Sequence, residues 1–213
     1  MDYNRAMIKT NYKTIEKELM TEQIIKKSKF IAYLAPVQNE DQAKEYLQAI
    51  KKEHYKATHH CSAYICDEIE RSNDDGEPAS SAGLPMLEVL RGNNLNYVIA
   101  VVVRYYGGIQ LGVGGLIRAY GSSVSLAIEE AELLIPQQVF KIKIQFPYEY
   151  TNDVENNLAD YAIVTERDYE EQAIYTILTS QKDQLEPLSD MTRGTISIEE
   201  LGVSVEYMKE EKS

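Results

Sequence analysis

Glycine and arginine gather in residues 97–121, YVIAVVVRYYGGIQLGVGGLIRAYG, in a pattern that could bind an anion. Six of the eleven glycines fall between Gly107 and Gly121. Glycine permits positive φ angles and a close approach of the backbone to another surface. The β-branched run before the glycines predicts a buried strand, and helical spacing returns after Gly115. Such a strand, turn and helix would present backbone N–H groups and a helix N-terminus, which favour negative charge.

The charges around this glycine-rich loop are of one sign. No acidic residue lies between Glu88 and Glu129, whereas Arg91, Arg104 and Arg118 do, in a chain of formal net charge −12. A guanidinium can hold two phosphate oxygens at once. We therefore predict that the loop and the start of the following helix bind a phosphate, with Arg104 or Arg118 as the counter-charge.

The known phosphate motifs do not match this loop. Gly107 and Gly112 have the P-loop spacing, but Val113 and Gly114 stand where Lys and Ser or Thr are required. Gly112 and Gly114 begin a dinucleotide fingerprint, but Ile117 occupies the third glycine position. A tight connection without a ligand therefore remains an alternative, although six glycines exceed what one turn needs.

A second segment, NDDGEPASSAGLPML at residues 73–87, also carries possible chemistry. Asp-Asp-Gly at 74–76 is a turn signal, and Glu-Pro at 77–78 favours extended backbone before the proline. Ser80 or Ser81 is then expected to cap a helix. The carboxylates could bind a cation or accept the free N–H groups of that helix, and we expect the second.

All the histidines and cysteines of the chain lie between residues 54 and 66. In a strand covering THHCSAYIC, Cys61 and Cys66 are five residues apart and so face opposite sides. Because a structural zinc site needs four convergent ligands, we predict no metal site here. We expect no disulfide either. The histidines are expected on a surface beside nearby lysines, namely Lys51, Lys52 and Lys56.

Composition points to a cytoplasmic protein. The chain has 213 residues, of which 44% are hydrophobic, and no apolar run reaches the ~18–20 residues of a membrane helix. The N-terminal MDYNRAMIKTNYK lacks the apolar stretch of a signal peptide. Residues 1–135 carry 15 basic and 18 acidic side chains, whereas residues 136–213 carry 7 basic and 16 acidic ones. Any nucleic-acid contact is therefore expected in the first part, because phosphate affinity rests on Lys and Arg.

The order of elements predicts a boundary near Pro136. In the first part, Asn39 and Gln42 form a capping-box pattern at the start of a helix. Its core-facing stripe holds Ala43, Tyr46, Leu47 and Ile50. Strands are expected at residues 14–21, 28–37, 60–66 and 98–103, and a helix after Gly115 ends near Leu134. The second part is expected to follow the order β-α-β-β-α-β, with a helix broken near Pro187.

DDGEPASSAGLPML followed by VVVRYYGGIQLGVGGLIRAYG closely resembles the paired signature of the YigZ/IMPACT family. KATHHCSAY, residues 56–64, also resembles a strand of that family. The resemblance covers the first ~130 residues strongly, and the layout of the remainder fits the second domain of bacterial members. One departure is Ala79-Ser80-Ser81, where a Ser-Gly-Thr triplet is common. The replacements are small and hydroxylated, so we expect the turn to survive.

This resemblance implies an α+β fold with two domains. Residues 1–135 would form a domain like domain 2 of ribosomal protein S5. Residues 136–213 would form a ferredoxin-like βαββαβ domain resembling the last domain of elongation factor G. By that analogy the protein would act around translation, through RNA, the ribosome or a translation-control protein. Fold analogy alone is a weak guide to function.

The expected function is therefore that of a binding or regulatory protein without a catalytic constellation, a cofactor or a metal. The alternative is an enzyme acting on a phosphorylated small molecule at the cleft between the DDGEP segment and the glycine loop. The oligomeric state stays open. The expected anion- or nucleic-acid-binding residues are Lys56, His59, His60, Arg104, Gly107, Gly108, Gly112, Gly114, Gly115 and Arg118. The signature turn is Asp75, Gly76, Glu77 and Pro78.

Overall fold

A computed structural model describes residues 12–209, so most of MDYNRAMIKTNYK, where the sequence predicts no signal peptide, lies outside the described residues. The chain divides into two compact units, one containing residues 12–135 and the other residues 136–208. Each unit combines an antiparallel sheet with helices, which confirms the α+β class. Among the described residues, no helix is both long and apolar enough to cross a membrane.

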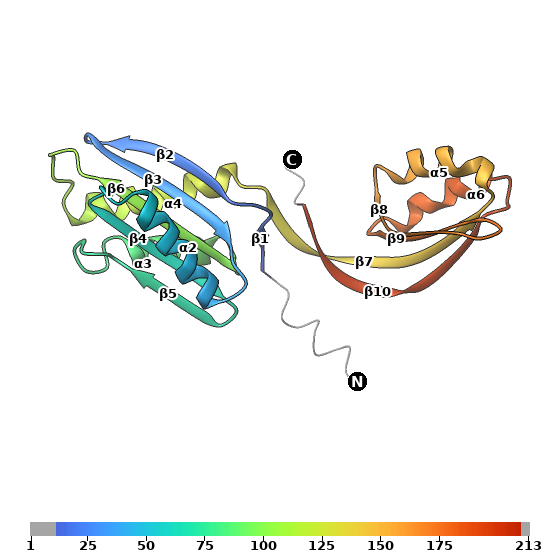
Figure 1. The fold of residues 1–213 in the computed structure, drawn as a ribbon, viewed down its shortest axis with the longest axis horizontal. Helices are drawn as coiled ribbons and strands as arrows, with labels where there is room; N and C mark the ends of the chain where they lie inside the picture. The colour runs from blue at the N-terminus through green and yellow to red at the C-terminus, as the bar shows by residue number, and fades with distance from the viewer. Residues whose placement is uncertain (1–11, 210–213) are drawn as a thin grey trace. The chain divides into compact units, whose positions relative to one another are not determined.

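The first unit is built on a five-stranded sheet in the order β2-β3-β6-β4-β5, and all neighbouring strands run antiparallel (Figure 1). The strands are β2 (Leu19–Ile25), β3 (Ser28–Pro36), β4 (His59–Cys66), β5 (Ile69–Asn73) and β6 (Val98–Tyr105). The helices are α2 (Glu40–Glu53), α3 (Gly83–Gly92) and α4 (Val113–Glu130). Strand β5 was not predicted, because IERSN has no apolar alternation that would mark it.

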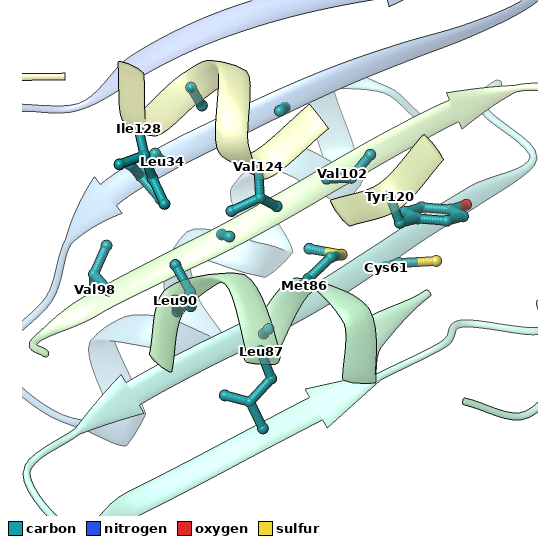
Figure 2. Packing of buried hydrophobic residues seen from close by; sticks show 14 of the residues in the cluster. Leu34, Cys61, Met86, Leu87, Leu90, Val98, Val102, Tyr120, Val124 and Ile128 are labelled. Carbon is teal, nitrogen blue, oxygen red and sulfur yellow. The ribbon is translucent and has the colours of Figure 1, made fainter. Parts of the chain in front are cut away.

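The central strand β6 is buried on both faces, as its β-branched run predicts. Val98 and Val102 point into a cluster that α3 and α4 complete, and Figure 2 shows side chains of both helices packed against strand residues. Ile99 and Val101 belong to a second cluster that includes Ala43 of α2. The sheet therefore separates two cores, and Cys61 and Cys66 of β4 belong to different ones, as predicted.

Helix α2 begins as predicted. The side chain of Asn39 accepts a hydrogen bond from the backbone N–H of Gln42, and Ala43 and Ile50 are buried. The Oε1 atom of Gln42 accepts from the N–H of Gln38, one residue earlier than a capping box requires.

The expected end of α4 near Leu134 is wrong. The helix ends at Glu130, and Leu133 and Leu134 already belong to β7 (Leu133–Phe146), where they pair with β1 (Thr14–Ile15). Short apolar runs such as LLI suit either state, and the pairing with β1 decides between them.

The second unit follows the order β7, α5 (Thr151–Leu158), β8 (Ala162–Tyr169), β9 (Ala173–Thr179), α6 (Glu186–Met191) and β10 (Ser197–Lys209). Strand β7 pairs with β9 and with β10, and β9 also pairs with β8. Ile142 and Ile144 of β7 bury their side chains with Val154 of α5 and Leu188 of α6. Pro187 is the second residue of α6 and lies in its first turn, where its missing N–H costs nothing. The proline therefore belongs to the start of this helix.

Candidate functional site

A buried ion pair lies between the two signature segments. Nη1 of Arg104, near the end of β6, lies 2.6 Å from Oε1 of Glu77, and the two side chains are 6% and 4% exposed. The hydroxyl of Tyr120, on α4, donates to the same oxygen at 2.7 Å. Burial, followed by the neighbouring Cys61 and Glu77, raises the pKa of Tyr120 well above its usual range, so the hydroxyl stays a donor. The sequence predicts Arg104 as a possible counter-charge for a phosphate, but in the structure this arginine is already paired with a carboxylate of the protein.

Asp74 caps helix α3. Its Oδ1 accepts hydrogen bonds from the N–H groups of Ala82 and Gly83 at 3.0 and 2.8 Å, and its Oδ2 accepts one from Ser80 at 2.8 Å. The expectation that Ser80 or Ser81 caps this helix is therefore wrong, because Oγ of Ser81 donates to the carbonyl of Pro78. The acceptance of helix N–H groups by a carboxylate of this segment is confirmed.

Asp75 ties the turn to the histidine strand. Its Oδ1 lies 2.7 Å from Nζ of Lys51, and its Oδ2 accepts the backbone N–H of His60 at 2.7 Å. Burial alone would raise the pKa of Asp75, but the Lys51 ammonium and the His60 N–H outweigh it and lower the pKa below its ordinary value. The ring of His60 is buried and contacts the carbonyl of His54 at 3.0 Å, which corrects its expected surface position.

His54 and His59 are also held by hydrogen bonds rather than spread on a surface. The ring of His54 lies between the hydroxyls of Tyr33 and Tyr105, at 2.6 and 2.9 Å. Nδ1 of His59 lies 2.9 Å from the carbonyl of Asp75. Among the described residues, no group of three or more His, Cys, Asp or Glu side chains is placed to hold a metal ion.

The signature segments meet in a cleft of about 460 Å³, which we call the acceptor cleft. His59, Glu77 and Arg104 contribute an imidazole, a carboxylate and a guanidinium to its lining. Its other lining residues are Thr58, Pro78, Tyr106, Gln110, Leu111, Gly112, Val113 and Leu116. The structure therefore brings together several predicted site residues, but the arginine among them is paired with Glu77.

The glycines of the loop serve different purposes. A Cβ on Gly107 would lie 2.0 Å from the carbonyl oxygen of Lys27, so this position requires glycine. Gly108 and Gly112 have φ angles of +81° and +72°, and Gly112 ends the loop at the start of α4. Gly114 lies within α4, where a Cβ would meet only the end of the Arg118 side chain at 3.8 Å. The backbone at Gly114 therefore tolerates a Cβ.

The structure places Arg118 beside a different cleft. This second cleft, of about 220 Å³, is lined by Ile25, Lys26, Leu111, Gly115, Arg118, Ala119 and Ser122, and we call it the basic cleft. Within residues 12–209, neither Lys26 nor Arg118 has a hydrogen bond or ion pair from its side chain. The basic cleft contains no acidic lining residue.

Sequence reasoning missed Lys26, and the signal for it was weak. Lys26 and Lys27 form the two-residue turn between β2 and β3, with φ angles of +46° and +67°. Such turns prefer Asn-Gly, so Lys-Lys gives little indication of a hairpin. Lys56 of the expected set is exposed and lies over the ring of Tyr55, and it lines neither of the two clefts.

Comparison with known proteins gives consistent results. Residues 26–128 match the family model described as the Impact N-terminal domain. The IMPACT family member YvyE of Bacillus subtilis is 38% identical over 212 residues, covering 94% of this chain and 98% of that protein. YigZ of Escherichia coli, also an IMPACT family member, is 35% identical over 82% of this chain and 90% of its own.

Two further matches extend the comparison. Protein IMPACT of Rattus norvegicus is 40% identical over 95 residues, which are 41% of this chain but 29% of the rat protein. A solved structure titled as that of an hypothetical protein is 31% identical, with a TM-score of 0.55 over 88% of this chain and 95% of its own.

Proposed function

This chain belongs to the IMPACT family, and from that premise we propose that it is a binding protein that acts around translation by contacting the phosphates of RNA, free or within the ribosome. The observation that carries the proposal is the basic cleft of the first unit, which Lys26 and Arg118 both line and where no carboxylate of the described residues pairs with either of them. Phosphate oxygens are the natural partners of such unpaired cations.

The start of α4 supports this assignment. Gly112, which precedes the helix, has no side chain to cap it, and the first turn holds no acidic residue. Gly115, in that first turn, lines the basic cleft together with Arg118, so the positive partial charge of the helix start adds to the charge of the arginine. We therefore propose the phosphate site on the Arg118 side of the loop, because Arg104 is already paired with Glu77.

The acidic charge of the second unit indicates that RNA is contacted through the first unit only. Residues 136–213 carry 7 basic and 16 acidic side chains, so their field repels a polyanion. We further propose that this unit is ferredoxin-like, because its strand order β10-β7-β9-β8 and its βαββαβ succession are typical of that fold. For the first unit we propose the S5 domain 2-like fold that the family resemblance implies.

The proposal is tested with a fluorescein-labelled 12-nucleotide single-stranded RNA and with purified ribosomes. Arg118→Gln is expected to weaken binding in an anisotropy titration and in ribosome co-sedimentation, while circular dichroism and the melting temperature stay unchanged. Arg91→Gln is the matched control, because Arg91 is also a surface arginine of the first unit but is paired with Glu70 and Glu88.

Two results would contradict the proposal. Equal RNA binding by the wild type and Arg118→Gln would show that the basic cleft does not bind RNA. Binding of small phosphorylated metabolites without binding of RNA or ribosomes would favour an enzyme acting on a phosphorylated small molecule.

A further inference from the structure

The acceptor cleft has an unusual set of polar groups for a phosphate-binding protein. Its apolar walls include Pro78, Leu111 and Val113, and its polar lining residues are Thr58, His59, Glu77, Arg104, Tyr106 and Gln110. A cleft of about 460 Å³ with apolar walls and a few convergent polar groups is typical of a site for a small group or part of a larger ligand.

His59 presents a hydrogen-bond acceptor to this cleft. Its Nδ1 lies 2.9 Å from the carbonyl oxygen of Asp75, and a carbonyl can only accept, so Nδ1 carries the proton. In the neutral ring Nε2 then has a free lone pair. Nε2 lies 3.8 Å from Oε1 of Glu77, so the lone pair of the neutral ring and the carboxylate stand side by side.

Glu77 has further acceptor capacity. A carboxylate offers about four lone-pair sites, whereas the hydrogen bonds from Arg104 and Tyr120 both arrive at Oε1. Nε of Arg104 is buried and has no hydrogen-bond partner among the described residues. That nitrogen is closed off from the cleft, so the cleft suits a group that donates a hydrogen bond to His59 or Glu77.

A phosphate does not meet this requirement. It brings only acceptors at full ionisation, and the charge of Arg104 is already matched by Glu77 at 2.6 Å. A hydroxyl meets it, because a hydroxyl donates one hydrogen bond and accepts others.

The neighbouring basic cleft indicates which class of hydroxyl-bearing ligand fits the acceptor cleft. Leu111 lines both clefts, so the two clefts are neighbours. Lys26 and Arg118 would repel a cationic side chain of a partner protein but attract a phosphate. Hydroxyl donors next to a phosphate occur together in a ribonucleotide.

We propose that the acceptor cleft binds the ribose hydroxyls of a single-stranded ribonucleotide whose phosphate lies in the basic cleft. This inference rests on the proposed function and specifies it, because the 2′-hydroxyl is what distinguishes RNA from DNA. The protein would then prefer RNA to DNA without reading a base sequence.

The experiment compares three labelled 12-mers of uridine on the full chain at one salt concentration: RNA, DNA and 2′-O-methyl RNA. RNA is expected to bind at least fivefold more tightly than DNA, and the 2′-O-methyl form, which lacks the donor, is expected to bind like DNA. The chain has 3 histidines, so their ring carbon-bound protons can be followed by NMR. The His59 signal is expected to shift with RNA and to stay in place with DNA.

Two variants test the roles of the two clefts separately. His59→Phe keeps a ring but removes the acceptor, and it should bring the ratio of RNA to DNA affinity close to one. Arg118→Gln should weaken RNA and DNA binding by the same factor and leave the ratio unchanged. If His59→Phe does not fold, the comparison of RNA, DNA and 2′-O-methyl RNA binding by the wild type still tests the inference.

Each other result overturns the inference. Equal binding of RNA and DNA with a clear loss in Arg118→Gln would leave the proposed function standing and remove the ribose site. No binding of any 12-mer would overturn the inference, and the absence of ribosome binding as well would overturn the proposed function. A shift of the His59 signal by an oligoarginine peptide, with none by RNA, would assign the acceptor cleft to a protein side chain.

Discussion

At the scale of single residues, Glu77 and Arg104 form a buried ion pair that the first unit needs. Both side chains are almost fully buried and lie 2.6 Å apart. Removing one partner of such a pair leaves an uncompensated charge, which typically costs about 3–5 kcal/mol. We expect Glu77→Gln and Arg104→Met each to lower the free energy of unfolding by about 3 kcal/mol.

The double variant Glu77→Gln/Arg104→Met should lose clearly less than the sum of the two, because neither charge is then left alone. Urea unfolding of all three variants measures this coupling. Arg91→Met is the control, since its exposed pairs with Glu70 and Glu88 should contribute less than about 1 kcal/mol. Additive losses in the double variant would mean that the pair does not couple.

Ser80 marks the point at which this chain departs from the usual family triplet. Its φ angle is +59°, a left-handed conformation that costs a residue with a Cβ about 1–2 kcal/mol. Glycine avoids that cost but loses more entropy on folding. Ser80→Gly should therefore stabilise the protein by about 0.5–1 kcal/mol in urea unfolding.

Ser81→Gly is the matched control for this prediction. Ser81 is fully buried and its Oγ donates to the carbonyl of Pro78 at 2.6 Å, so its replacement should destabilise. A loss of stability in Ser80→Gly similar to that in Ser81→Gly would contradict the proposed strain.

The arginines show what sequence can and cannot tell about a site. The sequence places Arg91, Arg104 and Arg118 in a stretch without carboxylates, which predicts a positive region. In the fold, Glu70 reaches Arg91 and Glu77 reaches Arg104, because β5 and the DDGEP turn lie beside them. Only the charge of Arg118 stays unpaired among the three within the described residues. Whether an arginine is paired depends on carboxylates that lie far from it in the sequence and close to it only in the fold.

At the scale of elements, the strand–loop–helix unit formed by β6, the glycine loop and α4 follows from its sequence, but the role of each glycine does not. The β-branched run predicts β6 correctly, and helical spacing predicts α4. The need for glycine at position 107 comes from the Lys26–Lys27 turn, which is remote in sequence and approaches within van der Waals distance.

Two alanine substitutions test these roles. Gly107→Ala places a Cβ 2.0 Å from the carbonyl oxygen of Lys27, so the backbone must move, and we expect a loss of about 3 kcal/mol or failure to fold. Gly114→Ala lies in α4 with free space around the new Cβ, and it should stabilise by about 0.5 kcal/mol through helix propensity. Thermal and urea unfolding measure both. Equal effects of the two substitutions would contradict this description of the loop.

At the scale of the whole molecule, the two compact units differ in charge and in their proposed tasks. Each has its own core, with Phe30 and Met86 in one and Phe146 and Tyr175 in the other. We therefore expect residues 1–135 and 136–213, expressed separately, each to unfold in a cooperative transition. Loss of cooperative unfolding in either fragment would show that it depends on the other. RNA binding should remain with the first fragment.

The central claim is that unpaired cations of the basic cleft bind phosphates, and the salt dependence of RNA binding by the full chain tests it most directly. Each phosphate contact to a single strand contributes about −0.7 to the slope of log K against log salt. Lys26→Gln/Arg118→Gln should therefore bind the 12-nucleotide RNA more weakly and with a slope reduced in magnitude by about 1.4. Arg91→Gln, whose arginine is already paired, should keep the wild-type slope. A double variant with the affinity and slope of the wild type would contradict the account.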